Sequence, residues 1–235
     1  MRSCLIQILI MVAIVFCLLW FGLPLGVSAL ATAALNAGGF TGSDTKVEVA
    51  ANPPFMLLTG HADTVRIRSS EAGMGDLHAA GVDVTLGDVE LLSRNIETVT
   101  GTLEGVRVAA PNGDPVTIDQ VSLQGSATAT TATANMSVAQ AEALAESQLK
   151  VQTGIVAKVA LKGPNLVTVT AGGKSQVGRL VTSNGSLLLV PNGDTLPTVT
   201  LISPGSGNPF RVTSVTIGLA GVTLIGTIDI QNLLG

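Results

Sequence analysis

The sequence predicts an α+β fold that is mostly β, with one short helix among the strands and an apolar helix at the amino end. Three observations indicate this class. Aliphatic and polar residues alternate along most of the chain beyond residue 36. The tetrapeptide Pro-Asn-Gly-Asp occurs twice between such runs, and one stretch without Gly or Pro is rich in strong helix formers. The 235 residues are 46% hydrophobic and 12% charged, with a net charge of -4.

The amino end is the most apolar part of the sequence. From Cys4 to Val27 it carries no charge, and about 20 apolar residues suffice to cross a bilayer. A signal peptide is the alternative, because Arg2 supplies a positive start and residues 29–31, Ala-Leu-Ala, offer a small-x-small cleavage site. The run exceeds the roughly 7–15 residues of an ordinary signal core, which favours an uncleaved transmembrane helix.

The chain therefore divides into a membrane anchor or signal segment, residues 1–35, and one extracytoplasmic domain, residues 36–235. We expect the anchor in the cell membrane with its positive end in the cytoplasm. The domain then faces the periplasm or the cell exterior, and is secreted if the segment is cleaved. Both cysteines, Cys4 and Cys17, fall in the first segment, so the domain has no disulfide and depends on its own core.

Alternation of period two predicts the strands of the domain. Such spacing places the aliphatic side chains of each strand on one face of a sheet. The alternating residues are Val47 and Val49, Val65 and Ile67, Val82, Val84 and Leu86, Val106 and Val108, Val116 and Ile118, Val121 and Leu123, Val167 and Val169, Leu187 and Leu189, Val199 and Leu201, Val215, Ile217 and Leu219, Val222 and Leu224, and Ile228 and Ile230.

Turn chemistry agrees with antiparallel strands. Asn-Gly tolerates the positive φ of tight hairpins, so residues 111–114 and 191–194 are each expected to join antiparallel neighbours. Two ordinary hairpins explain these copies better than a duplicated module, because the flanking sequences match only loosely. The low-complexity stretch 125–135 is either an exposed strand or a loop.

Residues 137–149 predict the short helix. Ser137 and Gln140 have the spacing of a capping box, in which each side chain satisfies an amide at the helix start. Apolar residues at helical spacing, namely Val138, Ala141, Leu144 and Ala145, then share one face. This stripe must be buried against a sheet. A further helical stretch is expected from the apolar segment through residue 36.

The sequence offers no enzyme, cofactor or metal site. His61 and His78 are the only histidines, and neither a nucleophile elbow, a zinc-protease helix nor a phosphate-binding glycine loop accompanies them. His61 and Asp63 alternate on one strand, but a third and a fourth metal ligand are not evident nearby. The Lys and Arg residues are scattered, which excludes a nucleic-acid partner. Arg66 and Arg68 share one side of their strand and are candidates for binding an anionic head group, with a solvated face as the alternative.

Several short motifs resemble the LmeA-like phospholipid-binding family of bacterial cell envelopes. Residues 53–60, PPFMLLTG, followed by a strand at 62–67, resemble the signature that opens that family. The later motifs also come in a similar order, with a strand block at 80–86, the capped helix from Ser137, and a closing block at 208–217 and 221–226. The resemblance covers nearly all of residues 30 to 235, although the second proline and the long amino-terminal segment depart from the family pattern.

The resemblance implies a tubular lipid-binding type of architecture, in which a curved antiparallel sheet wraps around a short helix and encloses an apolar groove. It also implies binding of phospholipid, or another acyl-chain ligand, beside the membrane in support of envelope assembly. The expected lipid-binding residues are Phe55, Met56, Leu57, Leu58, Val65, Ile67, Val138, Ala141, Leu144 and Ala145. A structural or adhesive β-sandwich without a lipid ligand is the alternative.

Overall fold

The computed structural model describes residues 23–37, 40–74, 77–93, 95–109, 115–193, 196–204 and 210–231. Most of the predicted anchor or signal segment lies outside these residues. Within them, no helix combines the length and the apolar character that a membrane crossing requires. The helices are α2 (Leu23–Ala37), the 3₁₀ helix η2 (Pro54–Thr59) and α3 (Val138–Thr153).

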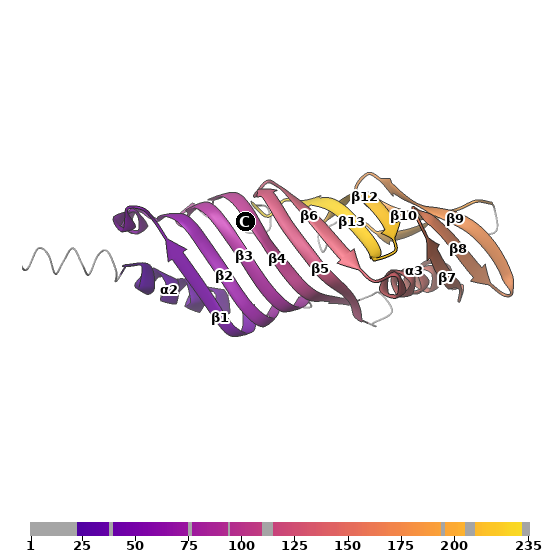
Figure 1. The fold of residues 1–235 in the computed structure, drawn as a ribbon, viewed down its shortest axis with the longest axis horizontal. Helices are drawn as coiled ribbons and strands as arrows, with labels where there is room; N and C mark the ends of the chain where they lie inside the picture. The colour runs from indigo at the N-terminus through magenta and orange to yellow at the C-terminus, as the bar shows by residue number, and fades with distance from the viewer. Residues whose placement is uncertain are drawn as a thin grey trace, which may run out of the picture.

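The described residues form two antiparallel sheets, which confirms the prediction of a mostly β fold. The eight-stranded sheet has the order β1-β2-β3-β4-β5-β6-β13-β12, and the five-stranded sheet has the order β11-β10-β9-β8-β7. In Figure 1 the molecule is elongated and the curled eight-stranded sheet runs along its length, with strands that cross the long axis obliquely. The strands are β1 (Phe40–Ala50), β2 (His61–Met74), β3 (Leu77–Glu90), β4 (Asn95–Ala109), β5 (Pro115–Ser126), β6 (Ala129–Met136), β7 (Lys158–Lys162), β8 (Leu166–Ala171), β9 (Lys174–Ser183), β10 (Ser186–Pro191), β11 (Val199–Ile202), β12 (Arg211–Gly218) and β13 (Gly221–Ile228).

Both Pro-Asn-Gly-Asp copies lie between antiparallel neighbours, as predicted. The first copy falls outside the described residues, but it connects β4 to β5, which pair along their lengths. The second copy is not a tight hairpin, because residues 192–198 separate β10 from its partner β11. The low-complexity stretch ends β5, turns at residues 127–128 and forms most of β6.

The two faces of the eight-stranded sheet differ in polarity. Directly paired residues point to the same side of a sheet, so the register fixes rows of side chains that run from strand to strand. One row contains Val49, Val65, Leu86, Val99, Gly125 and Thr130; the next contains Val47, Ile67, Val84, Gly101, Leu123 and Ala132; the third contains Ser69, Val82, Leu103, Val121, Ala134 and Leu224. We call this apolar side the inner face. The opposite, outer face carries Arg66, Arg68, Asp83, Thr85, Thr100, Thr102, Ser122 and Thr133.

The predicted helix and its capping box are confirmed in α3. The Ser137 hydroxyl accepts a hydrogen bond from the Gln140 amide, at 3.3 Å, and the Ser137 amide donates to the Gln140 side chain, at 2.9 Å. The helix runs four residues beyond the predicted end and stops at Gly154, which adopts a left-handed φ of 72°.

α3 also bonds to both edges of the five-stranded sheet. On the β7 edge, the Glu146 carboxylate accepts from the Val159 amide, at 2.9 Å, and Glu142 accepts from the Leu161 amide, at 2.8 Å. On the β11 edge, Gln152 exchanges hydrogen bonds with the backbone of Thr200. Helix side chains thus take the place of a neighbouring strand on two edges that would otherwise expose unpaired amides.

Two hydrophobic clusters form the core, one at each end of the inner face. The first unites α2 and η2 with β1 to β4 and contains Val47, Val49, Leu57, Val65 and Val99. The second surrounds α3 and unites the five-stranded sheet with β6, β12 and β13, with Leu149 and Leu189 among its fully buried side chains. The two helices therefore cover the two ends of the same apolar face.

Candidate functional site

The middle of the inner face is the part that neither helix buries. Its aliphatic side chains are only half-buried, whereas those beneath α2 and α3 are buried. We call this region the open strip, and it consists of Ile67, Val82, Val84, Leu86, Leu103, Val121 and Leu123. Val82 and Leu103, which are directly paired, lie outside both hydrophobic clusters, whereas the other five residues of the strip pack against the edge of one or the other. Partly accessible aliphatic side chains thus follow one another on adjacent strands.

A glycine lies in the centre of the open strip. Gly101 pairs with Val84 on one side and with Leu123 on the other. A Cβ atom at this position would approach the Val84 Cα atom to 2.7 Å, so the close passage of β4 past β3 requires glycine. The backbone of Asp83 and Val84 thus occupies the space that a side chain at position 101 would need.

The four predicted residues on α3 lie in a packed region. Ala141 and Ala145 are buried, and Val138 and Leu144 are half-buried. Leu144 and the two alanines line a cavity of only about 20 Å³ between the helix and both sheets. That volume accommodates about one water molecule. Here α3 fills the interior that the sequence predicted to be a groove, so an acyl chain has no room at this position.

The four lipid-binding residues predicted at 55–58, which lie in η2, divide between core and surface. Leu57 is buried in the cluster beneath the sheet, and Met56 is half-buried, while Phe55 and Leu58 are exposed. Sequence reasoning missed Leu91 and Leu92, two exposed leucines in the turn between β3 and β4. Two adjacent leucines between strands are the signal that could have identified this turn as an apolar surface.

The predicted β2 residues lie on opposite faces. Val65 and Ile67 belong to the inner face, whereas Arg66 and Arg68 belong to the outer face. Arg66 donates to both carboxylate oxygens of Asp83, at 2.8 and 2.6 Å. These hydrogen bonds hold the pKa of Asp83 below its ordinary value and raise the pKa of Arg66.

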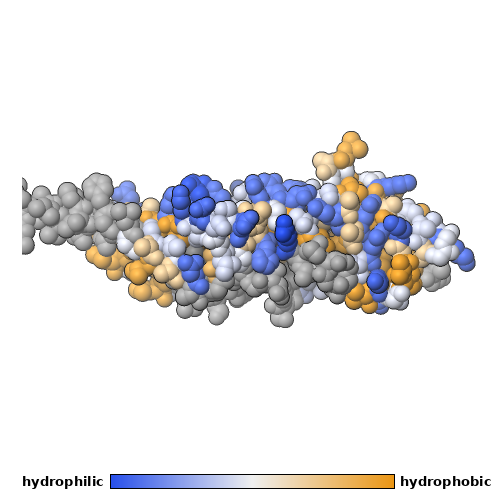
Figure 2. Space-filling view, turned by 90° about the horizontal axis from the view of Figure 1, so that it is seen from below, coloured by the Kyte–Doolittle hydropathy of each residue, from blue (hydrophilic) through white to orange (hydrophobic). Residues whose placement is uncertain are grey.

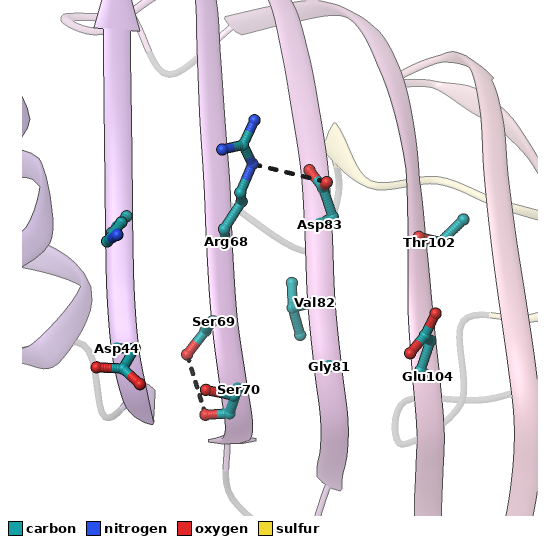
Figure 3. Close-up of a pocket in the computed structure, with 10 residues that line it drawn as sticks. Asp44, Arg68, Ser69, Ser70, Gly81, Val82, Asp83, Thr102 and Glu104 are labelled. Atoms are coloured by element: carbon teal, nitrogen blue, oxygen red, sulfur yellow. Dashed lines mark hydrogen bonds and ion pairs between the residues drawn. The ribbon is translucent and has the colours of Figure 1, made fainter.

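Arg68 also has acidic neighbours. It lies 3.6 Å from a Glu48 oxygen and 3.7 Å from an Asp83 oxygen. It lines an open pocket of about 470 Å³ together with Lys46 and the three acidic residues Asp44, Asp83 and Glu104; Figure 3 shows Arg68 directed toward Asp83. An anionic head group at this pocket would have to compete with these carboxylates, so the head-group prediction gains no support from the geometry.

Three acidic residues surround His61 at one end of β2 and β3. Its Nδ1 atom is 3.1 Å from Glu90 and its Nε2 atom is 3.3 Å from Asp63. The bond to Glu90 is the main reason why the pKa of His61 is raised, with Asp63 adding to it. Asp88, on β3, brings a third possible metal ligand to within 4.8 Å of His61 and Asp63. The carboxylates already satisfy both ring nitrogens, so an ion-paired surface cluster accounts for the arrangement.

Comparisons with known proteins identify no relative. No family model matches the chain, and no curated protein or solved structure matches it either. The resemblance to the LmeA-like family therefore stays a prediction from short motifs.

Proposed function

We propose that this protein binds phospholipid by holding an acyl chain along the open strip of the inner face. One observation carries the proposal: a single apolar face crosses the eight-stranded sheet, yet helices bury it only at its two ends. Partly exposed Val, Ile and Leu side chains favour a ligand that is itself aliphatic. An extracytoplasmic position beside the membrane, in support of envelope assembly, is the setting that the sequence resemblance implies.

The dimensions and energetics of the strip suit a hydrocarbon chain. Neighbouring strands lie about 4.8 Å apart, so the three spacings from β2 to β5, over which the strip extends, span about 14 Å. Each buried methylene contributes about 0.8 kcal/mol. A chain that follows the rows from strand to strand therefore gains substantial affinity without a specific head-group contact. The outer-face arginines play no part in this proposal.

Substitution of Val84 tests the proposal with a matched control. Val84→Trp fills the centre of the strip, whereas Thr85→Trp places the same ring on the outer face of the same strand. Displacing about two methylenes costs about 1.6 kcal/mol, which corresponds to more than a tenfold loss of affinity. We expect Val84→Trp to lower uptake of a fluorescent phospholipid by at least this factor, and Thr85→Trp to leave it unchanged.

Lipid carried by the purified full chain provides an independent measurement. Solvent extraction followed by mass spectrometry is expected to recover phospholipid from the unsubstituted protein and less from Val84→Trp. Circular dichroism must show that both tryptophan variants are folded. Equal uptake by the two variants, or extracts free of lipid, would rule out the open strip as the binding surface.

The outer face favours one second candidate, a structural or adhesive β-domain. Threonine and serine side chains form rows on β3 to β6 that are polar but mostly uncharged. Such a surface suits contact with a polymer or a protein partner. A lipid-free protein whose two tryptophan variants behave alike would favour this candidate.

A further inference from the structure

We propose that one end of the molecule inserts apolar side chains into the surface of a lipid bilayer. These side chains form the apolar tip, which consists of Phe55, Leu58, Leu91 and Leu92. The inference goes beyond the proposed function because it concerns a membrane contact at the end of the sheet. It does not require a lipid on the open strip.

All four side chains of the apolar tip are exposed to solvent. The exposed fraction is 53% for Phe55, 65% for Leu58, 39% for Leu91 and 84% for Leu92. Side chains three residues apart eclipse each other in a 3₁₀ helix, so Phe55 and Leu58 point to the same side of η2. Exposed large apolar residues that gather at one site mark a place of interaction.

Backbone contacts join the two parts of the tip. The Leu91 amide donates to the Gly60 carbonyl, at 2.7 Å, which ties the β3–β4 turn to the end of η2. Gly60 has a left-handed φ of 82°, and a Cβ atom there would lie 2.7 Å from the Leu92 Cγ atom. Leu92 therefore lies directly over the residue that ends η2.

The buried side of η2 holds the exposed side in place. Pro54 and Leu57 are buried, and the Thr59 hydroxyl bonds to the Met56 carbonyl. The tip is thus presented by a packed element. Pre-organised apolar groups need not be ordered upon binding, which reduces the entropic cost of insertion.

The position of α2 identifies a bilayer as the partner. α2 contacts both β1 and η2, so the described chain begins at the end that carries the tip (Figure 1). The preceding residues from Cys4 onward are uncharged and largely apolar, and that segment suits either a membrane anchor or a signal. Figure 2 shows further apolar surface at this end, and Leu30 of α2 is itself exposed.

The charges near the tip indicate how it binds. Asp63, Asp88 and Glu90 lie next to it on β2 and β3, and Glu90 immediately precedes Leu91. Acidic neighbours give no attraction to anionic lipids. Insertion must therefore depend on the apolar side chains, so vesicles of zwitterionic phosphatidylcholine are the appropriate probe.

Fluorophores at single positions of the full chain test the inference. Cys4 and Cys17 are changed to alanine, and one cysteine is introduced by Leu58→Cys, Leu92→Cys or, as the control, Leu219→Cys. Leu219 is a fully exposed leucine in the β12–β13 turn, remote from η2. Each labelled protein is combined with phosphatidylcholine vesicles with and without lipids that carry a quencher on the acyl chain.

We expect the labels at 58 and 92 to shift to the blue and to be quenched at least about twofold more than the label at 219. An inserted apolar face lies about 5–10 Å deep at the boundary between head groups and acyl chains, within reach of such quenchers. Labels at 58 and 92 that behave like the label at 219 would overturn the inference. So would a blue shift without vesicles that rises with protein concentration, because the partner is then a second copy.

Repeating the measurement with Val84→Trp separates this inference from the proposed function. If the tip touches the bilayer, quenching at 92 persists when the open strip is blocked. Quenching that disappears with Val84→Trp would come from a lipid on the strip, and would overturn the inference while supporting the proposed function. If the label at 92 is quenched in a protein that takes up no lipid, the result supports insertion of the apolar tip and refutes lipid binding on the open strip.

Discussion

Removing the two carboxylates that α3 provides to β7 is expected to destabilise the carboxyl-terminal half of the protein. Glu142 and Glu146 accept hydrogen bonds from the amides of Leu161 and Val159, at 2.8 and 2.9 Å. Both amides belong to buried residues of an edge strand. In the double variant Glu142→Ala/Glu146→Ala, these donors have no acceptor on the helix.

The expected loss follows from the cost of unpaired amides. A buried donor without a partner costs about 1–3 kcal/mol, so the double alanine variant is expected to lose about 2–6 kcal/mol. Domains of this size have free energies of unfolding of about 5–15 kcal/mol. The matched control is Glu142→Gln/Glu146→Gln, which retains an acceptor oxygen at each position and removes the same charge.

Urea denaturation of the full chain, followed by circular dichroism, measures the difference between the two variants. We expect the alanine variant to unfold at a clearly lower urea concentration than the glutamine variant, with a similar dependence on urea. Hydrogen exchange should show faster opening of the amides of Val159 and Leu161. If the two variants differ by less than about 0.5 kcal/mol, water replaces the carboxylates without cost and the proposed role of α3 is refuted.

Three further predictions concern stability. Leu149→Ala removes a fully buried side chain of α3 and should lower the free energy of unfolding by about 2–5 kcal/mol. A loss of less than about 1 kcal/mol, measured by urea denaturation, would contradict the tight packing of the core around this residue. Gly101→Ala should cost about 1–3 kcal/mol, because its Cβ atom would meet the Val84 backbone; an unchanged midpoint would show that β3 and β4 can separate locally. Glu90 is the main cause of the raised pKa of His61. The pair therefore stabilises the folded state fully below the unfolded pKa of histidine, about 6.5, and this stabilisation is lost as pH rises through the higher pKa of the folded state. The stability difference between the unsubstituted protein and His61→Gln should therefore shrink as pH rises, and a difference that grows with pH would contradict the assignment.

Local patterns in the sequence predicted the strands and the helix for physical reasons. Alternation fixes which side chains of a strand share a face, and Val82 and Val84 do lie on one face of β3. The capping box is likewise local, because Ser137 and Gln140 satisfy each other's amides without help from distant residues. The contacts of Glu142 and Gln152 with the sheet edges were not predictable, because they depend on strands that are far away in sequence.

The candidate site was less predictable, because exposure depends on what packs against each face. Leu57 and Leu58 are adjacent and chemically identical, yet one is buried beneath the sheet and the other is exposed at the tip. No pattern in the sequence indicated that Arg66 pairs with Asp83. That pair depends on the register of β2 with β3, which places the two residues on neighbouring strands of the outer face.

A single row of the inner face shows why the open strip exists. Val82, Leu103 and Val121 are half-buried, whereas Ala134 and Leu224, which continue the same row, are buried. All five are apolar and paired in register, so neither composition nor strand geometry explains the difference. Ala134 and Leu224 belong to the cluster around α3, and Val121 packs against the edge of that cluster, whereas Val82 and Leu103 lie outside it. The elements that pack against this face, rather than the pattern of the strands, therefore decide which part of it is accessible.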